Sequence, residues 1–166
     1  FVLAIIVKAF ILETDIVSGK SMEPSFEEGE KVFVEKISYL FGKPKRGDVI
    51  IFNPEGTKDK YIKRVVGLEG DIINIDEGKL YINDKLVIED YIQGETYTGV
   101  DQVSYPYEVL KGEYFVLGDN RLHSEDSRYL KLGKVTKHNI VGRVCLVVSP
   151  LENMRTLEKI EYSIDK

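Results

Sequence analysis

The sequence predicts a mainly β fold around one well-buried core. Short runs rich in Val, Ile, Tyr and Phe recur along the chain, and Gly, Pro, Asn or Asp bounds each of them, as is typical of strands joined by turns. Two polar stretches, Asp76-Glu77-Gly78 and Asn83-Asp84, separate such runs and predict hairpin turns. At 166 residues the chain is long enough for one core, or for a core with a small subdomain.

The chain opens on a segment, residues 1–12, that is apolar at every position except Lys8. Twelve helical residues span about 18 Å, less than the roughly 30 Å of a bilayer core. Since the first residue is Phe1 and not Met, we expect upstream residues that complete a membrane helix, and we assign 1–14 to its C-terminal part. A buried core helix and a cleavable signal peptide are the alternatives, although no basic n-region or small-x-small site is visible.

Seven strands are predicted beyond this segment, and one helical turn at residues 37–41. Residues 90–111 combine weak periodicity with many turn formers, which indicates either a long loop or part of a small inserted subdomain. The predicted strands are residues 31–36, 48–53, 60–67, 71–75, 78–83, 113–117 and 141–149. The predicted folded domain is 15–150, with a core of 15–71 and 112–150, a small β insertion at 72–111 and a charged tail at 151–166.

The composition argues against several classes of function. A formal net charge of −5, a pI near 5.2 and the lack of a basic stripe with interleaved aromatic residues argue against a nucleic-acid partner. The single cysteine, Cys145, lies in an apolar run, where we expect a small buried side chain, and it allows no internal disulfide. With two histidines and one cysteine, a zinc cluster of the usual ligands is not expected.

Residues 118–128, Gly-Asp-Asn-Arg-Leu-His-Ser-Glu-Asp-Ser-Arg, follow directly on an apolar run and are rich in polar side chains that can pair with one another. A solvated turn needs only one or two such groups, so this segment predicts a polar site. We expect its acids and arginines to satisfy one another in the interior, because an unpaired buried charge is costly. Gly118 is expected to let the backbone approach closely.

Two upstream features suggest a nucleophile and a base. Gly19 and Pro24 predict a rigid turn that presents Ser21, although a surface turn with several serines is the simpler interpretation of this segment alone. Lys63 lies inside an apolar strand, where burial can lower a lysine pKa by up to about 3–5 units and make the amine a competent base. An edge strand with outward charges is the alternative. Together the features predict a peptidase, because a serine hydroxyl needs a neighbour that takes its proton.

Three motifs carry a resemblance to a known family: Ser21-Met22-Glu23-Pro24, residues 61–71 (Tyr-Ile-Lys-Arg-Val-Val-Gly-Leu-Glu-Gly-Asp) and residues 118–128. In this order they resemble the bacterial type I signal peptidases, membrane-anchored Ser-Lys peptidases that remove signal peptides. The likeness runs from the apolar N-terminus to about Pro150. It implies the signal-peptidase and LexA-like β-fold, a mixed antiparallel β-sheet core with a small inserted β subdomain.

The resemblance implies Ser21 as nucleophile, Lys63 as general base and Ser124 as the serine that hydrogen-bonds and orients the lysine. It also implies two supporting ion pairs, Asp126 with Arg128 and Arg64 with Asp119.

The chain departs from the family pattern at four places. Many members have a serine at the position of Gly19, whose hydroxyl joins the oxyanion hole, so the hole here rests on the Ser21 amide with Ser18 or a water as possible help. Smaller departures are Ser25, Glu69 and the short segment between Asp71 and Lys111, which excludes a large cap domain.

The resemblance also implies the substrate and the location. The substrate is expected to be the signal peptide of an exported pre-protein, extended along a strand edge, with an acyl-enzyme intermediate and no metal or other cofactor. The enzyme is expected in the cell membrane, in contact with lipid, as a single-pass protein with its catalytic domain on the extracytoplasmic side. Shallow pockets for small side chains, one and three residues before the cut, are predicted near Val17, Met22, Phe26 and Ile62.

Three other interpretations are distinguishable. A Ser-His-Asp triad through His123, Ser124 and Asp126 is the catalytic rival, since histidine has the better generic pKa for a base. A membrane-tethered binding domain without chemistry has no use for a buried lysine beside a presented serine. A repressor-type self-cleaving peptidase shares the serine and the lysine strand, but such proteins lack the Gly-Asp-Asn-Arg segment and carry an upstream DNA-binding domain.

Overall fold

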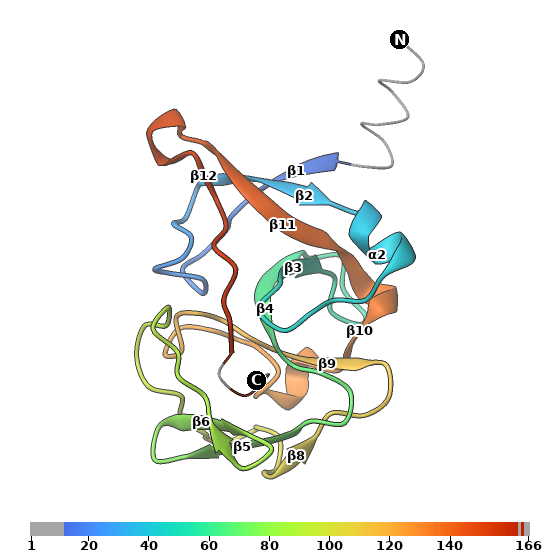
Figure 1. Cartoon of the computed structure of the whole chain (residues 1–166), viewed down its shortest axis with the longest axis vertical. Coiled ribbons are helices and arrows are strands. Elements are labelled where there is room, and N and C mark those ends of the chain that lie inside the picture. The colour runs from blue at the N-terminus through green and yellow to red at the C-terminus, as the bar shows by residue number, and fades with distance from the viewer. Residues whose placement is uncertain (1–11, 163, 165–166) are drawn as a thin grey trace.

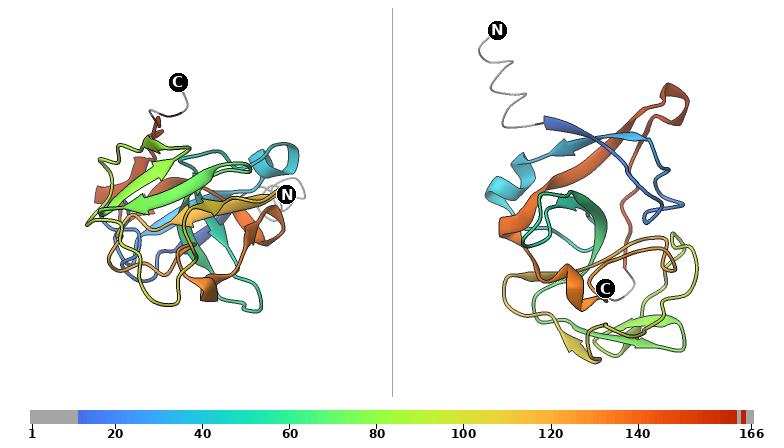
Figure 2. Two further views of the ribbon diagram at one scale, coloured as in Figure 1. Left: turned by 90° about the horizontal axis from the view of Figure 1, so that it is seen from below. Right: turned by 180° about the vertical axis from the view of Figure 1, so that it is seen from behind.

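The computed structural model describes residues 12–162 and 164. Their backbone forms two antiparallel β-sheets, so the predicted mainly β fold is confirmed (Figure 1). The large sheet has the strand order β1-β2-β11-β3-β4-β9-β10, with β12 paired to β11. The small sheet has the order β7-β6-β5-β8 and lies at the opposite end of the molecule from α2 and the β11–β12 turn (Figure 2).

All seven predicted strands are present, and so is the predicted helical turn, α2 (Ile37–Phe41). Each run of β-branched and aromatic residues buries at least one face, and the strand ends where a turn former follows. Their bounds are β2 (Lys31–Glu35), β3 (Val49–Phe52), β4 (Tyr61–Gly67), β5 (Ile72–Asp76), β6 (Lys79–Ile82), β9 (Glu113–Leu117) and β11 (Ile140–Ser149).

Five strands and three 3₁₀ turns have no counterpart in the sequence prediction. Most are two or three residues long, too short for any periodicity to develop. The strands are β1 (Leu12–Ile16), β7 (Lys85–Leu86), β8 (Tyr107–Glu108), β10 (Val135–Thr136) and β12 (Arg155–Thr156), and the turns are η1 (Leu130–Leu132), η2 (Lys137–Asn139) and η3 (Leu151–Asn153).

The first strand corrects the end of the predicted membrane helix. Residues 12–14 belong to β1, which pairs in register with β2 from Leu12↔Glu35 to Ile16↔Lys31. The rest of that prediction falls on residues 1–11, which lie outside the described part of the chain. No helix within the described residues is long and apolar enough to cross a bilayer.

Strand β4 occupies the interior of the large sheet, with β3 on one side and β9 on the other. The alternative that Lys63 stands on an edge strand with its charge in solvent is therefore wrong. Apolar residues on both faces of β4 belong to separate core clusters, Ile62 in one and Val65 in another. A polar side chain on this strand is consequently surrounded by protein on either face.

The C-terminal segment packs against the domain and is not the free tail that its charge predicted. Arg155 forms an ion pair with Glu30 at 2.6 Å, and Leu157 packs on the core cluster that holds Val32. Tyr162 is only 2% exposed and belongs to the core that includes Phe115. Scattered apolar residues among the charges anchor the segment, a pattern too sparse to predict from composition.

Cys145 is another correction. It was predicted to be a buried apolar residue, but it is half-buried, and its thiol donates a 3.5 Å hydrogen bond to the Phe33 carbonyl oxygen. The neighbouring Val144 takes the inward position on β11 instead, at 3% exposure. A β-bulge explains the difference: the pairing of β11 with β2 passes from Val144↔Val34 to Leu146↔Phe33, so Cys145 is the extra residue without a partner in the register.

Candidate active site

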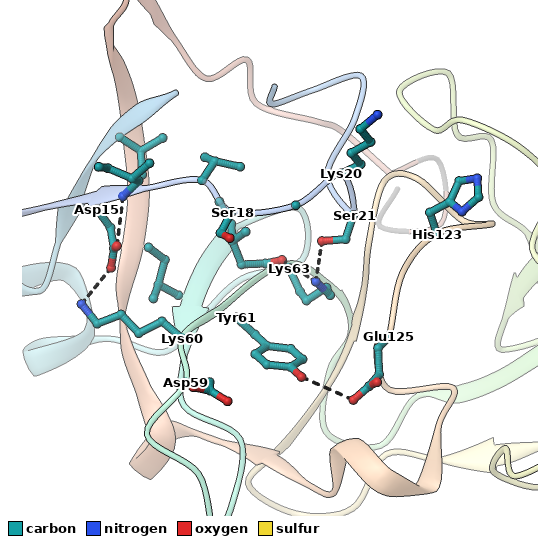
Figure 3. A pocket seen from close by; sticks show the side chains of 16 residues that line it. Asp15, Ser18, Lys20, Ser21, Asp59, Lys60, Tyr61, Lys63, His123 and Glu125 are labelled. Carbon is teal, nitrogen blue, oxygen red and sulfur yellow. Dashed lines mark hydrogen bonds and ion pairs between the residues drawn. The ribbon is translucent and has the colours of Figure 1, made fainter. Parts of the chain in front are cut away.

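Lys63 and Ser21 point toward each other across the large sheet (Figure 3). The Lys63 Nζ lies 2.8 Å from Ser21 Oγ and donates a second hydrogen bond to the Ile62 carbonyl oxygen at 2.9 Å. Only 4% of Lys63 is exposed, and the Tyr61 ring centroid lies 5.4 Å from its Nζ. Two residues that are 42 positions apart in the sequence are thus in direct contact.

Burial lowers the pKa of Lys63 from 10.5 to about 8, although the charges of Asp126, Asp119 and Glu125 oppose the shift. An ammonium ion removed from water loses hydration, so the neutral amine is favoured. At pH 7 about one molecule in ten then carries a neutral lysine, compared with about one in 2,500 for an exposed lysine. The amine can therefore accept a proton close to neutral pH.

A tight turn between β1 and β2 presents Ser21. Gly19 has a φ of +78°, a conformation in which glycine is unstrained. The Phe26 amide donates to the Met22 carbonyl at 2.9 Å, and the Val17 amide donates to the Glu30 carbonyl at 2.8 Å. These hydrogen bonds hold the two ends of the turn together. The Ser21 side chain lies between them and is partly exposed.

The polar segment 118–128 lies directly against the turn that carries Ser21. The Asn120 amide donates a 3.0 Å hydrogen bond to the Ser21 carbonyl oxygen. A Cβ atom on Gly118 would lie 2.2 Å from Ser124 Oγ and 2.5 Å from Ser21 O, so only glycine fits there. The expected close backbone approach at Gly118 is therefore present.

Ser124 does not make the hydrogen bond to Lys63 that the resemblance implied. It is 6% exposed, and its hydroxyl has no hydrogen-bond partner in the described part of the chain. Lys63 instead directs its hydrogen bonds to Ser21 and Ile62, while Ser124 packs against Gly118. Ser124 consequently lies beside the Ser21 turn without contacting the amine through a hydrogen bond.

Both of the expected ion pairs are present, and their side chains are buried. The Arg64 guanidinium donates to both oxygens of Asp119 at 2.9 and 2.5 Å. The Arg128 guanidinium donates to both oxygens of Asp126 at 2.8 and 3.0 Å, and Asp126 also accepts from the Gly118 amide at 3.0 Å. Such bidentate pairs fix the orientation of both side chains.

Arg121 pairs outside segment 118–128, contrary to the expectation that the acids and arginines of this segment satisfy one another. Its guanidinium donates to both oxygens of Glu89 at 2.6 and 2.8 Å and to the Thr96 hydroxyl at 2.5 Å. Asp119 and Asp126 are already saturated by the other two arginines, so a third acid is needed. Glu89 and Thr96 are the residues that sequence reasoning missed, and no motif marks either of them.

A groove of about 480 Å³ leads to Ser21 and Lys63. Of the four predicted pocket residues, Val17 and Ile62 line it. Met22 and Phe26 do not, because both are 0% exposed and pack in the core with Val34. One wall runs from Asp15 to Ser21, the other from Asp59 to Lys63, and the remaining lining residues are Val32, Ile51, His123 and Glu125.

His123 borders the groove, but its side chain is directed away from Ser21 (Figure 3). It makes no side-chain hydrogen bond that would link it to Ser21, Ser124 or Asp126 within the described residues. Asp126 is 0% exposed and engaged by Arg128. The geometry therefore contradicts a Ser-His-Asp triad. Residues 12–162 and 164 also contain no group of three or more His, Cys, Asp or Glu that could hold a metal ion.

Comparisons with known proteins show which family the chain resembles. Residues 1–149 match the family described as signal peptidase, peptidase S26. Signal peptidase I T of Bacillus subtilis (strain 168) is 40% identical over 162 residues, which cover 92% of this chain and 82% of that protein. Signal peptidase I of Bacillus amyloliquefaciens is 38% identical over 159 residues, with the same two coverages of 92% and 82%.

A solved structure is also similar. The crystal structure of a signal peptidase I from Enterococcus faecalis V583 superposes with a TM-score of 0.51 at 34% sequence identity. The match covers 61% of this chain and 96% of that one. Sequence and fold thus lead to one assignment. The chain belongs to the signal peptidase family, peptidase S26.

Proposed function

We propose that this signal peptidase removes signal peptides from exported pre-proteins, with Ser21 as nucleophile and Lys63 as general base. The observation that carries the proposal is the 2.8 Å contact between Lys63 Nζ and Ser21 Oγ at a lysine that is 4% exposed. A neutral amine at hydrogen-bond distance is what a serine hydroxyl requires to lose its proton during attack.

The reaction has two halves. Ser21 Oγ attacks the carbonyl carbon of the scissile bond while its proton passes to Lys63 Nζ, and the lysine ammonium then gives a proton to the leaving amine as the C–N bond breaks. The acyl group remains on Ser21 as an ester. Lys63 next takes a proton from an attacking water and gives it to Ser21 Oγ as the ester bond breaks, which releases the acyl group as a carboxylic acid and regenerates both the serine and the neutral amine. The steps require no metal or other cofactor.

The backbone amide of Ser21 is proposed to stabilise the oxyanion. Backbone amides aimed at the developing negative charge act strongly in a site from which water is excluded. Gly19 offers no hydroxyl for a second hydrogen bond. Ser18 lines the groove and is exposed, so it is the side chain at hand for that role.

The substrate is proposed to lie extended between the two walls of the groove. Among residues 12–162 and 164, strand β1 pairs with β2 alone, so we propose its other edge as the place for an added strand. Val17 and Ile62 provide apolar surface on opposite walls, where they suit the small side chains one and three residues before the cut. Met22 and Phe26 act from beneath, as packing that keeps the turn of Ser21 rigid.

The five supporting residues are proposed to form a frame around the dyad. Arg64 with Asp119 and Arg128 with Asp126 fix segment 118–128, which in turn carries the Asn120 amide that holds the Ser21 carbonyl. Ser124 fills the space beside Gly118 and Ser21. We propose that the frame, more than any single contact, keeps the two reacting atoms together.

We propose that residues 1–11 attach the enzyme to the membrane as part of a single-pass anchor, with the catalytic domain on the extracytoplasmic side. The support is the apolar character of residues 1–11, interrupted only by Lys8. In this division the catalytic core comprises 15–71 and 112–150, and 72–111 is an insertion that contains the small sheet.

Peptide hydrolysis with three variants tests the proposal. The substrate is an internally quenched peptide with alanine one and three residues before the cut. Ser21→Ala and Lys63→Ala should each abolish cleavage, while His123→Ala should retain most of it. Full activity of Ser21→Ala, or loss of activity only in His123→Ala, would overturn the assignment. A wild-type sample quenched during turnover should carry the acyl group on Ser21 by mass spectrometry.

A further inference from the structure

The buried pair of Glu89 and Arg121 joins segment 72–111 to the polar segment beneath Ser21. The two side chains are 4% and 0% exposed, and both guanidinium Nη atoms donate to the carboxylate, at 2.6 and 2.8 Å. Thr96, from the same segment as Glu89, accepts a further hydrogen bond from Arg121. A charge pair so enclosed has a fixed geometry, since neither side chain has room to rotate away.

Arg121 acts on the backbone as well as on Glu89. Its Nε donates to the Gly118 carbonyl oxygen at 2.9 Å. Gln93 pairs with the chain on either side of Asn120, since its amide donates to the Asp119 carbonyl at 2.8 Å and its carbonyl accepts from the Arg121 amide at 2.9 Å. Segment 72–111 therefore holds residues 118–121 in two ways, through the side chain of Glu89 and through the main chain of Gln93.

The same four residues lie directly against the nucleophile. The Asn120 amide holds the Ser21 carbonyl at 3.0 Å, and Gly118 approaches so closely that a Cβ would lie 2.5 Å from that oxygen. A displacement of residues 118–121 must consequently be transmitted to Ser21. Lys63 would not follow, because β3 and β9 hold its strand on both sides.

A second contact runs from the same carboxylate. The Tyr91 hydroxyl donates to Glu89 Oε1 at 2.6 Å, and the Tyr91 ring covers the Arg64 guanidinium at 4.6 Å. Arg64 neighbours Lys63 in β4 and pairs with Asp119. Glu89 thus lies at the junction of two paths that reach the dyad from different sides.

We propose that Glu89 is a positioning residue for the Ser21–Lys63 dyad: by holding Arg121 it fixes residues 118–121, and through them the distance of Ser21 from Lys63. This inference rests on the proposed function. Without the carboxylate Arg121 becomes a buried unpaired charge, which is strongly destabilising in place and favours a shift toward Asp126 or toward solvent. Either shift moves Gly118 and Asn120.

Steady-state kinetics of Glu89→Gln test the inference, with the quenched peptide as substrate. We expect kcat to fall between about tenfold and a hundredfold, because misplacement of a reacting group by about 1 Å has effects of this size. KM should stay within about twofold, because Glu89 lies outside the groove walls. The matched control is Glu108→Gln, an exposed glutamate of the same segment, which should keep both constants.

The outcomes separate positioning from stability. A Glu89→Gln protein that is folded at the assay temperature and retains wild-type kcat would overturn the inference, even if its melting temperature is lower. If Glu89→Gln does not fold, Glu89→Asp replaces it in the test, because aspartate keeps the negative charge but its shorter side chain moves the carboxylate away from Arg121. A lower kcat of Glu89→Asp at unchanged KM supports the positioning role, and an unchanged kcat refutes that role. An active Ser21→Ala would instead refute the proposed function itself.

Discussion

Lys63 and Arg64 are buried neighbours on β4, but their protonation responds to burial in opposite ways. Arg64 donates to both oxygens of Asp119 and stays charged, as a guanidinium does in proteins. Lys63 forms no ion pair with any described residue, and its nearest partners are a hydroxyl and a carbonyl oxygen. Burial therefore outweighs the more distant charges of Asp126, Asp119 and Glu125 at Lys63 and favours the neutral amine, whereas the direct pair with Asp119 offsets the burial of Arg64.

The pH dependence of catalysis follows from this difference. The pKa of Lys63 is lowered to about 8, and only the neutral amine accepts the Ser21 proton. We expect kcat/KM to rise about tenfold per pH unit below pH 8 and to level off above it. A series of rate measurements from pH 6 to 10 checks this. A limb that levels off near pH 6.5 would indicate a histidine base instead.

The stability of Lys63→Met should show the energetic side of the same shift. Burial lowers the pKa of Lys63 from 10.5 to about 8, so below pH 8 the folded state carries a buried ammonium at a cost on the order of 3 kcal/mol. Wild-type stability from this group rises with pH between about 8 and 10.5, because the unfolded chain binds the extra proton.

Urea unfolding checks this at two pH values. The inactive Lys63→Met variant should exceed the wild type in unfolding free energy by about 3 kcal/mol at pH 7, with the difference shrinking toward pH 10.5. An equal difference at both pH values would show that the lysine is not forced toward neutrality. Other titrating groups are common to both proteins and cancel in the comparison.

At the scale of elements, strand prediction succeeded where packing and local sequence agree. Strands β3, β4 and β9 are four to seven residues long, mostly apolar and buried at almost every position, with turn formers at their ends. Strand β8 is two residues long and exists because it pairs with β5, a tertiary fact that local sequence does not encode. Strand β1 reads Leu-Glu-Thr-Asp-Ile, too polar to stand out, and owes its form to β2.

The residues of the site were more predictable from the sequence than the contacts between them. Ser21, Lys63 and the pairs of Asp119 and Asp126 follow from the motifs, since a lysine in an apolar strand and acids beside arginines are visible in sequence. The Glu89–Arg121 pair is not visible, because a lone glutamate in a loop matches many arginines equally well. Whether Met22 faces the groove or the core likewise depends on how the turn packs, and it faces the core.

The C-terminal segment is expected to stabilise the domain through Tyr162. Its ring is 2% exposed, and its hydroxyl lies 2.6 Å from that of Tyr91. Tyr162→Ala should lower the unfolding free energy by about 3 kcal/mol, as is usual when a buried aromatic side chain is removed. The measurement is urea denaturation, with Tyr97→Ala, which removes a half-exposed tyrosine, as the control. Equal stability of the two variants would mean that residues 151–166 are a tail after all.

At the scale of the whole molecule, the proposed mechanism places the reaction on the large sheet and gives segment 72–111 a supporting role. The groove, the dyad and the two supporting ion pairs of Asp119 and Asp126 all lie at residue 15 or beyond. The small sheet contributes no groove residue, yet the loop between its strands β7 and β8 supplies Glu89, the partner of Arg121. Catalysis and membrane attachment are therefore expected to be separable.

Removal of residues 1–11 tests this separation. The shortened chain should cleave a soluble peptide with kcat/KM within about threefold of the full chain, because no described contact of the site depends on those residues, and an effect of that size is below about 1 kcal/mol. Sedimentation with phospholipid vesicles should show that binding is lost at the same time. Cleavage of the peptide that disappears with residues 1–11 would contradict the separation of the two functions.

The central claim is that the Lys63 amine, in contact with Ser21, loses its proton near pH 8, so that a useful neutral fraction is present close to neutral pH. Its most direct test is an NMR titration of the Lys63 side chain in protein with ¹³C-labelled lysine, with the Lys63→Met spectrum used to assign the resonance. We predict a midpoint near pH 8, more than two units below that of the exposed lysines. A midpoint near 10.5, together with an active enzyme, would contradict the claim.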